Sequence, residues 1–242
     1  MLSNDWLGLG LYFGLLLAAG LPVILVKIYG NLPFEVTRKL YHLVITLSIY
    51  PLVRFFNNWY MAVLAVLLLA LIAYPALARF ENAALFRRIA VERELGEFKR
   101  SLLIVQGSMA LLLFVFWGIL GPHWKYVAVV AVMAWGLGDA AAAIVGKAIG
   151  RRRIEHPRIA GKKTYEGTLA MFITAALAVF FTLLMEGGQP WPVSLMVALL
   201  VAPVCATVEL FSNKGMDTLT VPISTGLAVL SLVTLFSFQG LS

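Results

Sequence analysis

The chain has 242 residues, of which 61% are hydrophobic and only 13% are charged. This balance excludes an ordinary soluble domain, because too few polar side chains are available to cover its surface. Cys205 is the single cysteine, so it cannot form an intramolecular disulfide and is expected to be a small core residue. We therefore expect a multi-pass integral membrane protein, in the plasma membrane or an internal membrane, whose residues 1–242 form a single membrane domain.

Eight apolar segments are long enough to be transmembrane helices, since about 20 apolar residues cross the hydrocarbon core. They are too long and too uniformly apolar for barrel strands, so an all-α bundle of transmembrane helices is predicted. In chain order they cover residues 6–26, 40–56, 60–78, 101–120, 124–146, 168–185, 192–211 and 219–238. The second segment is the shortest and contains Pro51, so seven spans plus a re-entrant segment is the alternative. Asp5, with no basic residue before the first segment, predicts a retained span rather than a cleaved signal peptide.

The distribution of basic residues predicts how the chain is oriented in the membrane. With the N-terminus outside, all of the 19 Lys and Arg residues except Arg54 and Lys125 fall in loops on the cytoplasmic side. Because cytoplasmic loops are rich in Lys and Arg, both termini are predicted to lie on the non-cytoplasmic side. These loops, facing anionic membrane lipids, account for the net charge of +7, so no nucleic-acid partner is expected. The loop 79–100 mixes both signs of charge and predicts a solvated or interfacial helix.

Acidic side chains gather at the cytoplasmic ends of the later spans. Asp139 lies eight residues before Lys147, about 12 Å deeper along a helix. A carboxylate at that depth is costly unless it faces a polar cavity, a cation or a basic partner. Glu209 and Asp217 lie beside the next two spans on the same side, which favours Mg²⁺, an ion that one or two carboxylates bind together with water and phosphates. A structural ion pair is the alternative for Asp139 and for Glu209.

The residues that follow Asp139 suggest a place for an anion. Gly138, Ala142, Gly146 and Gly150 recur every four residues and make a smooth helix face for another helix or a ligand. The loop beyond them offers a positive cradle made by Arg151, Arg152, Arg153, Arg158, Lys162 and Lys163. Basic groups beside Mg²⁺-binding acids are what phosphoryl chemistry needs, because it depends on neutralising charge on phosphate oxygens. The segment is not a P-loop, since Lys163 stands where that motif has Ser or Thr.

A second basic patch lies in "EVTRKLYHL", at the start of the second span. On a helix, Arg38 and His42 lie one turn apart on one face, with Lys39 close to His42. The patch predicts positive charge for a phosphate and an imidazole able to exchange a proton near neutral pH. Basic side chains that extend to the membrane surface, with an incidental histidine, are the alternative.

Three blocks in order resemble the CTP-dependent lipid-alcohol kinases, which comprise dolichol kinase, phytol and farnesol kinases and the fungal-type diacylglycerol kinase. They are "RKLYHL" from Arg38, "GDAAAAIVGKAIGR" with "KKTYEGTLAMF" between residues 138 and 172, and "VELFSNKGMDTLTVPI" between residues 208 and 223. The middle block is the most specific. The resemblance implies transfer of the γ-phosphoryl group of CTP to the primary hydroxyl of a membrane isoprenoid alcohol, such as phytol, farnesol, geranylgeraniol or a polyprenol, or of a related lipid alcohol. The active site would lie at the cytoplasmic face.

The resemblance also implies roles for single residues. It assigns Asp139 to the Mg²⁺–nucleotide complex, Lys162 and Lys163 to the phosphates, and Glu166 to the loop or the metal, with Glu209 and Asp217 on the second side of the site. Together with the patterns above, it predicts catalytic roles for Asp139, Lys163, Glu209, Asp217 and His42. The expected metal ligands are Asp139, Asp217 and Glu166. The expected nucleotide-binding residues are Arg38, Lys39, Gly138, Gly146, Gly150, Lys162, Lys163, Thr164, Glu166 and Gly167. Glu209 or Asp217 is the expected base, although Asp217 is followed by Thr218 where the family commonly has Asn.

Two other functions compete with the kinase. The middle block also resembles CDP-diacylglycerol synthases, in which phosphatidate attacks the α-phosphorus of CTP. Their K-R-x-x-x-x-K-D and P-G-H-G-G sequences are absent from this chain. A small transporter would have acids through the depth of the bilayer and two matching halves, whereas these polar groups gather at one face. The expected partners are therefore CTP, a lipid alcohol from the bilayer and membrane lipids, and the sequence leaves room for a homo-oligomer.

Overall fold

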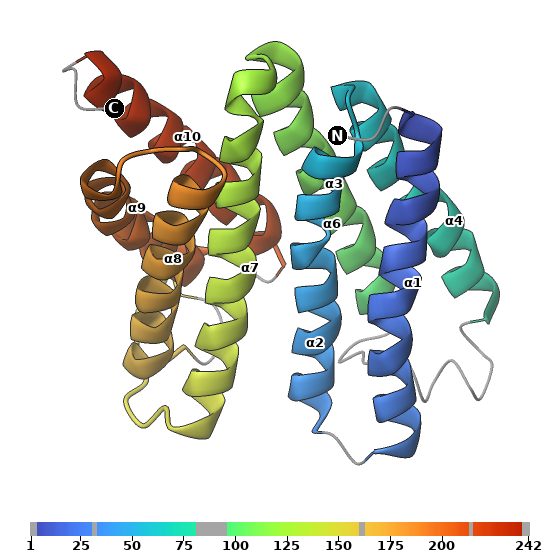
Figure 1. Ribbon diagram of the computed structural model, residues 1–242. Coiled ribbons are helices and arrows are strands. Elements are labelled where there is room, and N and C mark those ends of the chain that lie inside the picture. The colour runs from blue at the N-terminus through green and yellow to red at the C-terminus, as the bar shows by residue number, and fades with distance from the viewer. Residues whose placement is uncertain (1–3, 31–32, 81–95, 160–162, 213–214, 239–242) are drawn as a thin grey trace. The chain divides into compact units, whose positions relative to one another are not determined.

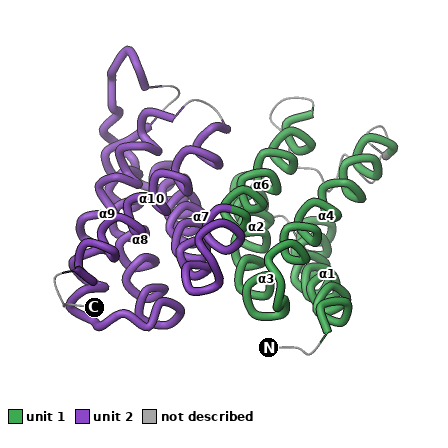
Figure 2. Tube along the Cα trace, turned by 90° about the horizontal axis from the view of Figure 1, so that it is seen from above, with its two compact units in different colours: residues 1–114 green, residues 115–242 purple. Residues whose placement is uncertain are grey.

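The computed structural model describes residues 4–30, 33–80, 96–159, 163–212 and 215–238 (Figure 1). The described chain is all-α, apart from a single antiparallel bridge between Arg153 and Thr164. It divides into two compact units, Met1–Phe114 and Val115–Ser242, which Figure 2 distinguishes by colour. Each unit is described below by itself.

Unit 1 contains five described helices. They are α1 (Asp5–Tyr29), α2 (Phe34–Leu47), α3 (Ile49–Phe55), α4 (Trp59–Phe80) and α6 (Glu97–Leu113). Both α2 and α3 pack along α1, one after the other (Figure 1). They are separate helices because the helical hydrogen bonding is interrupted at Ser48. Pro51, in the first turn of α3, has no N–H to donate to the carbonyl of Leu47, the last residue of α2. At about 1.5 Å per residue, the two together extend roughly 33 Å, close to the thickness of the hydrocarbon core.

The start of α1 is fastened to the turn between α3 and α4. The carboxylate of Asp5 accepts hydrogen bonds from the backbone N–H of Asn57 at 2.8 Å and from the side-chain amides of Asn57 and Asn58 at 3.1 and 2.8 Å. Asn4 caps the helix by accepting from the N–H of Trp6 at 2.9 Å. Gly8 is needed nearby, because a Cβ there would lie 2.7 Å from the carbonyl oxygen of Phe55.

Unit 2 is built around α7 (Lys125–Ala148). The other elements are η1 (Phe114–Ile119), η2 (Pro122–Trp124), α8 (Tyr165–Met185), α9 (Trp191–Phe211) and α10 (Asp217–Phe238). Residues 126–136 of α7 are all buried, and α8 and α10 pack along this helix. In contrast, α1 buries only Gly8 and Tyr12, and its large apolar side chains are exposed, as in a helix that faces lipid.

Seven helical segments of the described chain are long and apolar enough to cross a membrane. They are Asp5–Tyr29, Trp59–Arg79, Glu97–Ile119, Pro122–Ala148, Tyr165–Met185, Trp191–Phe211 and Asp217–Phe238. The protein is therefore a multi-pass integral membrane protein, and seven of the eight expected spans are confirmed to within a few residues. The remaining one, 40–56, coincides with the broken pair α2 and α3. Most of the expected interfacial helix in the loop 79–100 lies outside the described residues, and only its end is described, as the first turn of α6.

Candidate active site

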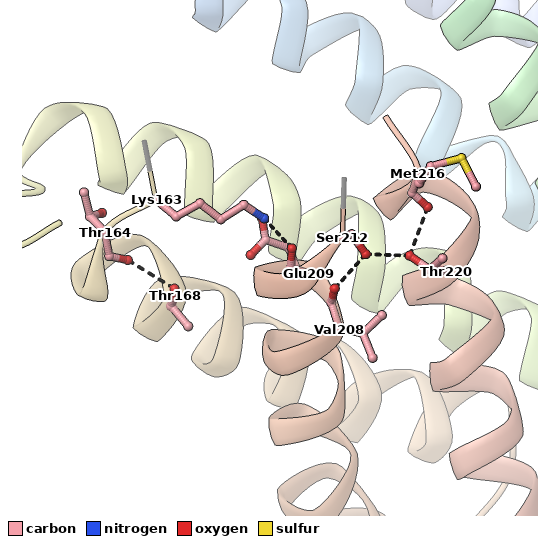
Figure 3. Close-up of polar contacts among 8 residues, drawn as sticks. All are labelled: Lys163, Thr164, Thr168, Val208, Glu209, Ser212, Met216 and Thr220. Atoms are coloured by element: carbon pink, nitrogen blue, oxygen red, sulfur yellow. Dashed lines mark hydrogen bonds and ion pairs between the residues drawn. The ribbon is translucent and has the colours of Figure 1, made fainter. Parts of the chain in front are cut away.

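The connection between α7 and α8 meets the end of α9 through a charged pair. The ammonium of Lys163, just before α8, donates to the carboxylate oxygen Oε1 of Glu209 at 2.7 Å and to the backbone carbonyl of the same residue (Figure 3). The side chains of Lys163 and Glu209 are only 21% and 11% exposed. Two residues predicted separately as part of the site are thus in direct contact, at the cytoplasmic end that the sequence predicts for these helices.

The backbone around Lys163 is held by the chain that leaves α7. Ile154 donates its N–H to the carbonyl of Lys163 at 2.9 Å, and Tyr165 donates to the carbonyl of Arg152 at 3.1 Å. These two bonds make a short antiparallel pairing on either side of Arg153 and Thr164. The pairing places Arg153, whose side chain is exposed, beside Thr164 just before α8. It also fixes the backbone from which the Lys163 side chain extends.

The first turn of α8 carries a cap and a carboxylate. Thr164 accepts a hydrogen bond from the N–H of Gly167 at 3.1 Å, which satisfies one of the free donors at the helix start. Glu166 lies in the same turn, where the positive end of the helix dipole stabilises negative charge. Its Oε1 accepts from the N–H of Arg152 at 3.3 Å. Thr164 and Glu166 therefore fix the start of α8, next to Lys163, and link it to Arg152.

The glycine face of α7 is covered by α8. A Cβ on Gly146 would lie 3.1 Å from the hydroxyl of Thr164, and one on Gly150 would lie 2.8 Å from the same hydroxyl and closer still to the carbonyl of Gly146. A Cβ on Gly138 would meet the side chain of Met171, with Cε at 3.0 Å. The structure therefore shows the helix-packing alternative for these glycines, which let α8 approach closely. Contact between them and a nucleotide stays a prediction.

Asp139 and Asp217 lie on the two other helices of this end of unit 2. Asp139 follows Gly138, so its side chain is rotated by about 100° from the face that packs on α8. It is partly exposed and lies about 13 Å from the C-terminal end of α7. Asp217 is the first residue of α10 and is also partly exposed.

The start of α10 is tied to the end of α9 by hydroxyl groups (Figure 3). The hydroxyl of Ser212 donates to the carbonyl of Val208 at 2.6 Å and lies 2.7 Å from the hydroxyl of Thr220. Thr220 has one hydroxyl proton, which it can donate either to the hydroxyl of Ser212 or to the carbonyl of Met216, 3.0 Å away. This chain of contacts links the helix that carries Glu209 to the helix that begins with Asp217.

The carboxylates of unit 2 could bind Mg²⁺ only if water or substrate phosphates supplied the remaining ligands. No group of three or more His, Cys, Asp or Glu side chains in the described ranges is close enough to hold a metal ion. Mg²⁺ is commonly held by one or two carboxylates together with water and substrate phosphates, so such a group is not required. The Oε2 atom of Glu166 is buried and accepts no hydrogen bond within the described part of the chain. A carboxylate oxygen in this state is suited to bind a cation.

The basic patch on α2 lies in unit 1, where it has its own acidic partners. The guanidinium of Arg38 donates to Glu97 at 3.1 Å and lies 3.5 Å from the carboxylate of Glu35. Lys39 is buried and His42 is partly exposed on the same helix. The spacing of Glu35 and Arg38 is typical of an ion pair and could have been recognised from the sequence, but Glu97 lies 59 residues away and carries no such signal. The expected contacts of Arg38, Lys39 and His42 with a nucleotide stay predictions, and Lys162 lies outside the described residues.

Comparisons with known proteins support the grouping suggested by these residues. No solved structure matches the chain significantly. The chain is 32% identical over 234 residues to phytol kinase from Synechocystis sp., an alignment that covers 92% of this chain and 90% of that protein. The sequence profile described as the cytidylyltransferase family matches residues 13–213, a range that includes both Lys163 and Glu209. The resemblance drawn from the sequence is thereby confirmed, and the chain belongs to the cytidylyltransferase family.

Proposed function

We propose that the protein is a CTP-dependent kinase that phosphorylates the primary hydroxyl of an isoprenoid alcohol dissolved in the membrane. The observation that carries this proposal is the identity of 32% to phytol kinase across 92% of the chain. The geometry supports it, because at one end of unit 2 the carboxylate of Glu209 holds a partly shielded lysine, Lys163, and the carboxylate of Glu166 binds the backbone of Arg152. Phosphoryl transfer needs such groups to position the phosphates and to neutralise their charge.

The candidate residues divide between binding the nucleotide and activating the acceptor. Lys163, with Lys162 beside it in sequence, would neutralise the phosphate oxygens. Asp139 would hold Mg²⁺, with Asp217 on the second side, and this ion would neutralise charge on the phosphates. Glu166 is bonded to Arg152, beyond the end of α7 from which Asp139 lies about 13 Å, so it would bind a cation nearer the loop and not share that ion with Asp139. Glu209, Asp217 and His42 are the candidates for orienting the hydroxyl and accepting its proton. The acceptor's apolar tail would remain in the bilayer and reach the site between helices.

The reaction consumes only CTP and the alcohol. The hydroxyl oxygen forms a bond to the γ-phosphorus, and the bond from that phosphorus to the β,γ-bridging oxygen breaks. CDP leaves with that electron pair, and the hydroxyl proton passes to the base and then to water. The products are the phosphorylated alcohol and CDP.

Labelled nucleotides test this reaction against its main competitor. A cytidylyltransferase is the second candidate, because the matched family carries that name. It would join a lipid phosphate to the α-phosphorus of CTP and release pyrophosphate. With purified protein, Mg²⁺ and phytol, farnesol, geranylgeraniol or a polyprenol, we expect γ-labelled CTP to label a lipid and α-labelled CTP to leave it unlabelled.

The opposite labelling pattern, with phosphatidate as the acceptor, would replace the kinase by a cytidylyltransferase. If neither labelled nucleotide labels a lipid with any acceptor, including diacylglycerol, both enzyme activities are contradicted. A transporter is then the remaining hypothesis. Comparing the alcohols in the same assay also identifies the preferred acceptor.

We further propose eight membrane crossings with both termini on the non-cytoplasmic side. The combined length of α2 and α3 supports a broken but complete crossing. Single cysteines introduced at Asn57 and at Arg158, in a chain with Cys205 replaced by Ser, should react with a membrane-impermeant reagent from opposite sides. In intact cells we expect labelling at position 57 and protection at position 158. Labelling of both positions from outside would rule out this topology.

A further inference from the structure

We infer that Glu209 is a positioning residue that holds the ammonium of Lys163 in place for a nucleotide phosphate, and is not the base that accepts the hydroxyl proton. This inference rests on the proposed function, within which Glu209 was one of three candidates for the base. It follows from how the two side chains are bound to each other and from what anchors them.

The contact fixes the position of the ammonium on two sides. Lys163 donates to the carboxylate of Glu209 at 2.7 Å and to the backbone carbonyl of the same residue. That carbonyl belongs to the last turn of α9, where the helix dipole favours a positive charge. A lysine side chain loses much rotamer freedom when it is held, so a lysine already held loses less when it binds a phosphate.

Among the described residues, the ammonium keeps one donor for a ligand. An ammonium has three N–H donors, and the described contacts of Lys163 use two of them, both with Glu209. The side chain of Lys163 is 21% exposed, so the third donor can be reached without breaking the pair. The ammonium can therefore contact a phosphate oxygen while Glu209 continues to hold it.

The same contact makes Glu209 a poor base. Glu209 is only 8% exposed, so an alcohol hydroxyl has little access to its carboxylate. A base must also reach the hydroxyl that it deprotonates, but Oε1 of Glu209 is already occupied by Lys163. These features leave Asp217 and His42 as the candidates for the base.

The anchor of Glu209 is itself secured. Ser212, three residues later, donates its N–H to the carbonyl of Val208 at 2.9 Å and its hydroxyl to the same carbonyl. Its contact of 2.7 Å with Thr220 joins this turn to α10. The end of α9 is therefore held by α10 on one side and holds Lys163 on the other.

The test compares Glu209→Gln, Glu209→Ala, Lys163→Gln and the double variant Lys163→Gln with Glu209→Gln. Glu155→Gln is the matched control, because it removes an exposed carboxylate from the loop between α7 and α8. For each purified protein, the dissociation constant of CTP is measured with Mg²⁺, and kcat and the KM for CTP are measured with saturating alcohol. Thermal unfolding in detergent confirms that each variant is folded. If Glu209→Ala does not fold, Glu209→Gln still provides the test, because glutamine has nearly the same size as glutamate.

We expect Glu209→Gln and Glu209→Ala to raise the Kd and KM for CTP about tenfold, with a much smaller change in kcat. The double variant should bind CTP no more weakly than Lys163→Gln alone, because Glu209 acts only through that lysine. Glu155→Gln should resemble the wild type. A loss of about 10²–10⁴-fold in kcat with unchanged CTP binding would show that Glu209 is the base, and would overturn the inference.

Two other outcomes also overturn it. Tighter CTP binding by Glu209→Gln would mean that Glu209 competes with phosphate for Lys163. Unchanged binding would mean that the pair is purely structural. If the wild type binds CTP but phosphorylates no alcohol, the proposed kinase function fails, and the binding comparison alone still decides the role of Glu209.

Discussion

Replacing Asp139 by Asn is expected to lower the rate of CTP-dependent lipid phosphorylation by at least about 10²-fold. Asp139 is partly exposed about 13 Å along α7 from its charged end, a costly place for a carboxylate without a role. Asn keeps the size of the side chain but loses the charge that would bind Mg²⁺. The measurement is the initial rate of label transfer from γ-labelled CTP at several Mg²⁺ concentrations.

The variant should still accumulate in the membrane at the wild-type level, because the substitution changes neither volume nor backbone. Asp139→Glu retains the charge and should keep part of the activity, most visibly at high Mg²⁺. Glu155→Gln serves as the control for charge removal elsewhere in unit 2 and should be fully active. Full activity in Asp139→Asn would refute the assignment of this residue to the metal.

Replacing Gly150 by Ala is expected to destabilise unit 2 by about 2–3 kcal/mol, in the upper range for inserting a methyl group into a packed site. The new Cβ would lie 2.8 Å from the side chain of Thr164 and closer still to the carbonyl of Gly146. Relief requires movement of backbone at the end of α7 or at the start of α8. Because Lys163 immediately precedes Thr164, activity should fall together with stability. The midpoint of thermal unfolding in detergent should drop by about 5–10 °C.

Gly107→Ala is the matched control for this substitution. A Cβ at Gly107, in the interior of α6, would have no neighbour within 4 Å. Alanine is a better helix former than glycine by about 1 kcal/mol, so this variant should be at least as stable as the wild type. A Gly150→Ala protein that unfolds at the wild-type temperature would show that α7 and α8 do not approach as closely as described.

Most helices were predictable from the sequence because membrane insertion depends on local composition. The spans of α1, α4, α8 and α10 follow from runs of apolar residues, and their ends lie within a few residues of the predicted ones. The segment 40–56 was the weakest prediction because Pro51 interrupts it. In the structure, the expected single span is two helices, and the first begins earlier, at Phe34.

The candidate residues of the site could be named from the sequence, but their contacts could not. Asp139, Lys163 and Glu209 were identified because charged residues are rare in apolar segments and because their motifs resemble those of a family. The glycines of α7 allowed two interpretations, and periodicity alone could not choose between a helix and a ligand. The structure shows the side chain of Thr164 beside two of them.

The sequence by itself determined that this protein crosses the membrane several times and belongs to an enzyme family, because apolar runs, loop charges and short motifs are local properties. Only the tertiary structure decided that Lys163 is held by Glu209, 46 residues further along the chain, and that Arg38 is paired with Glu97. Such pairs form only where packed helices bring distant segments together. In unit 2, α8 packs between α7 and α9, and this packing brings the start of one helix to the end of another.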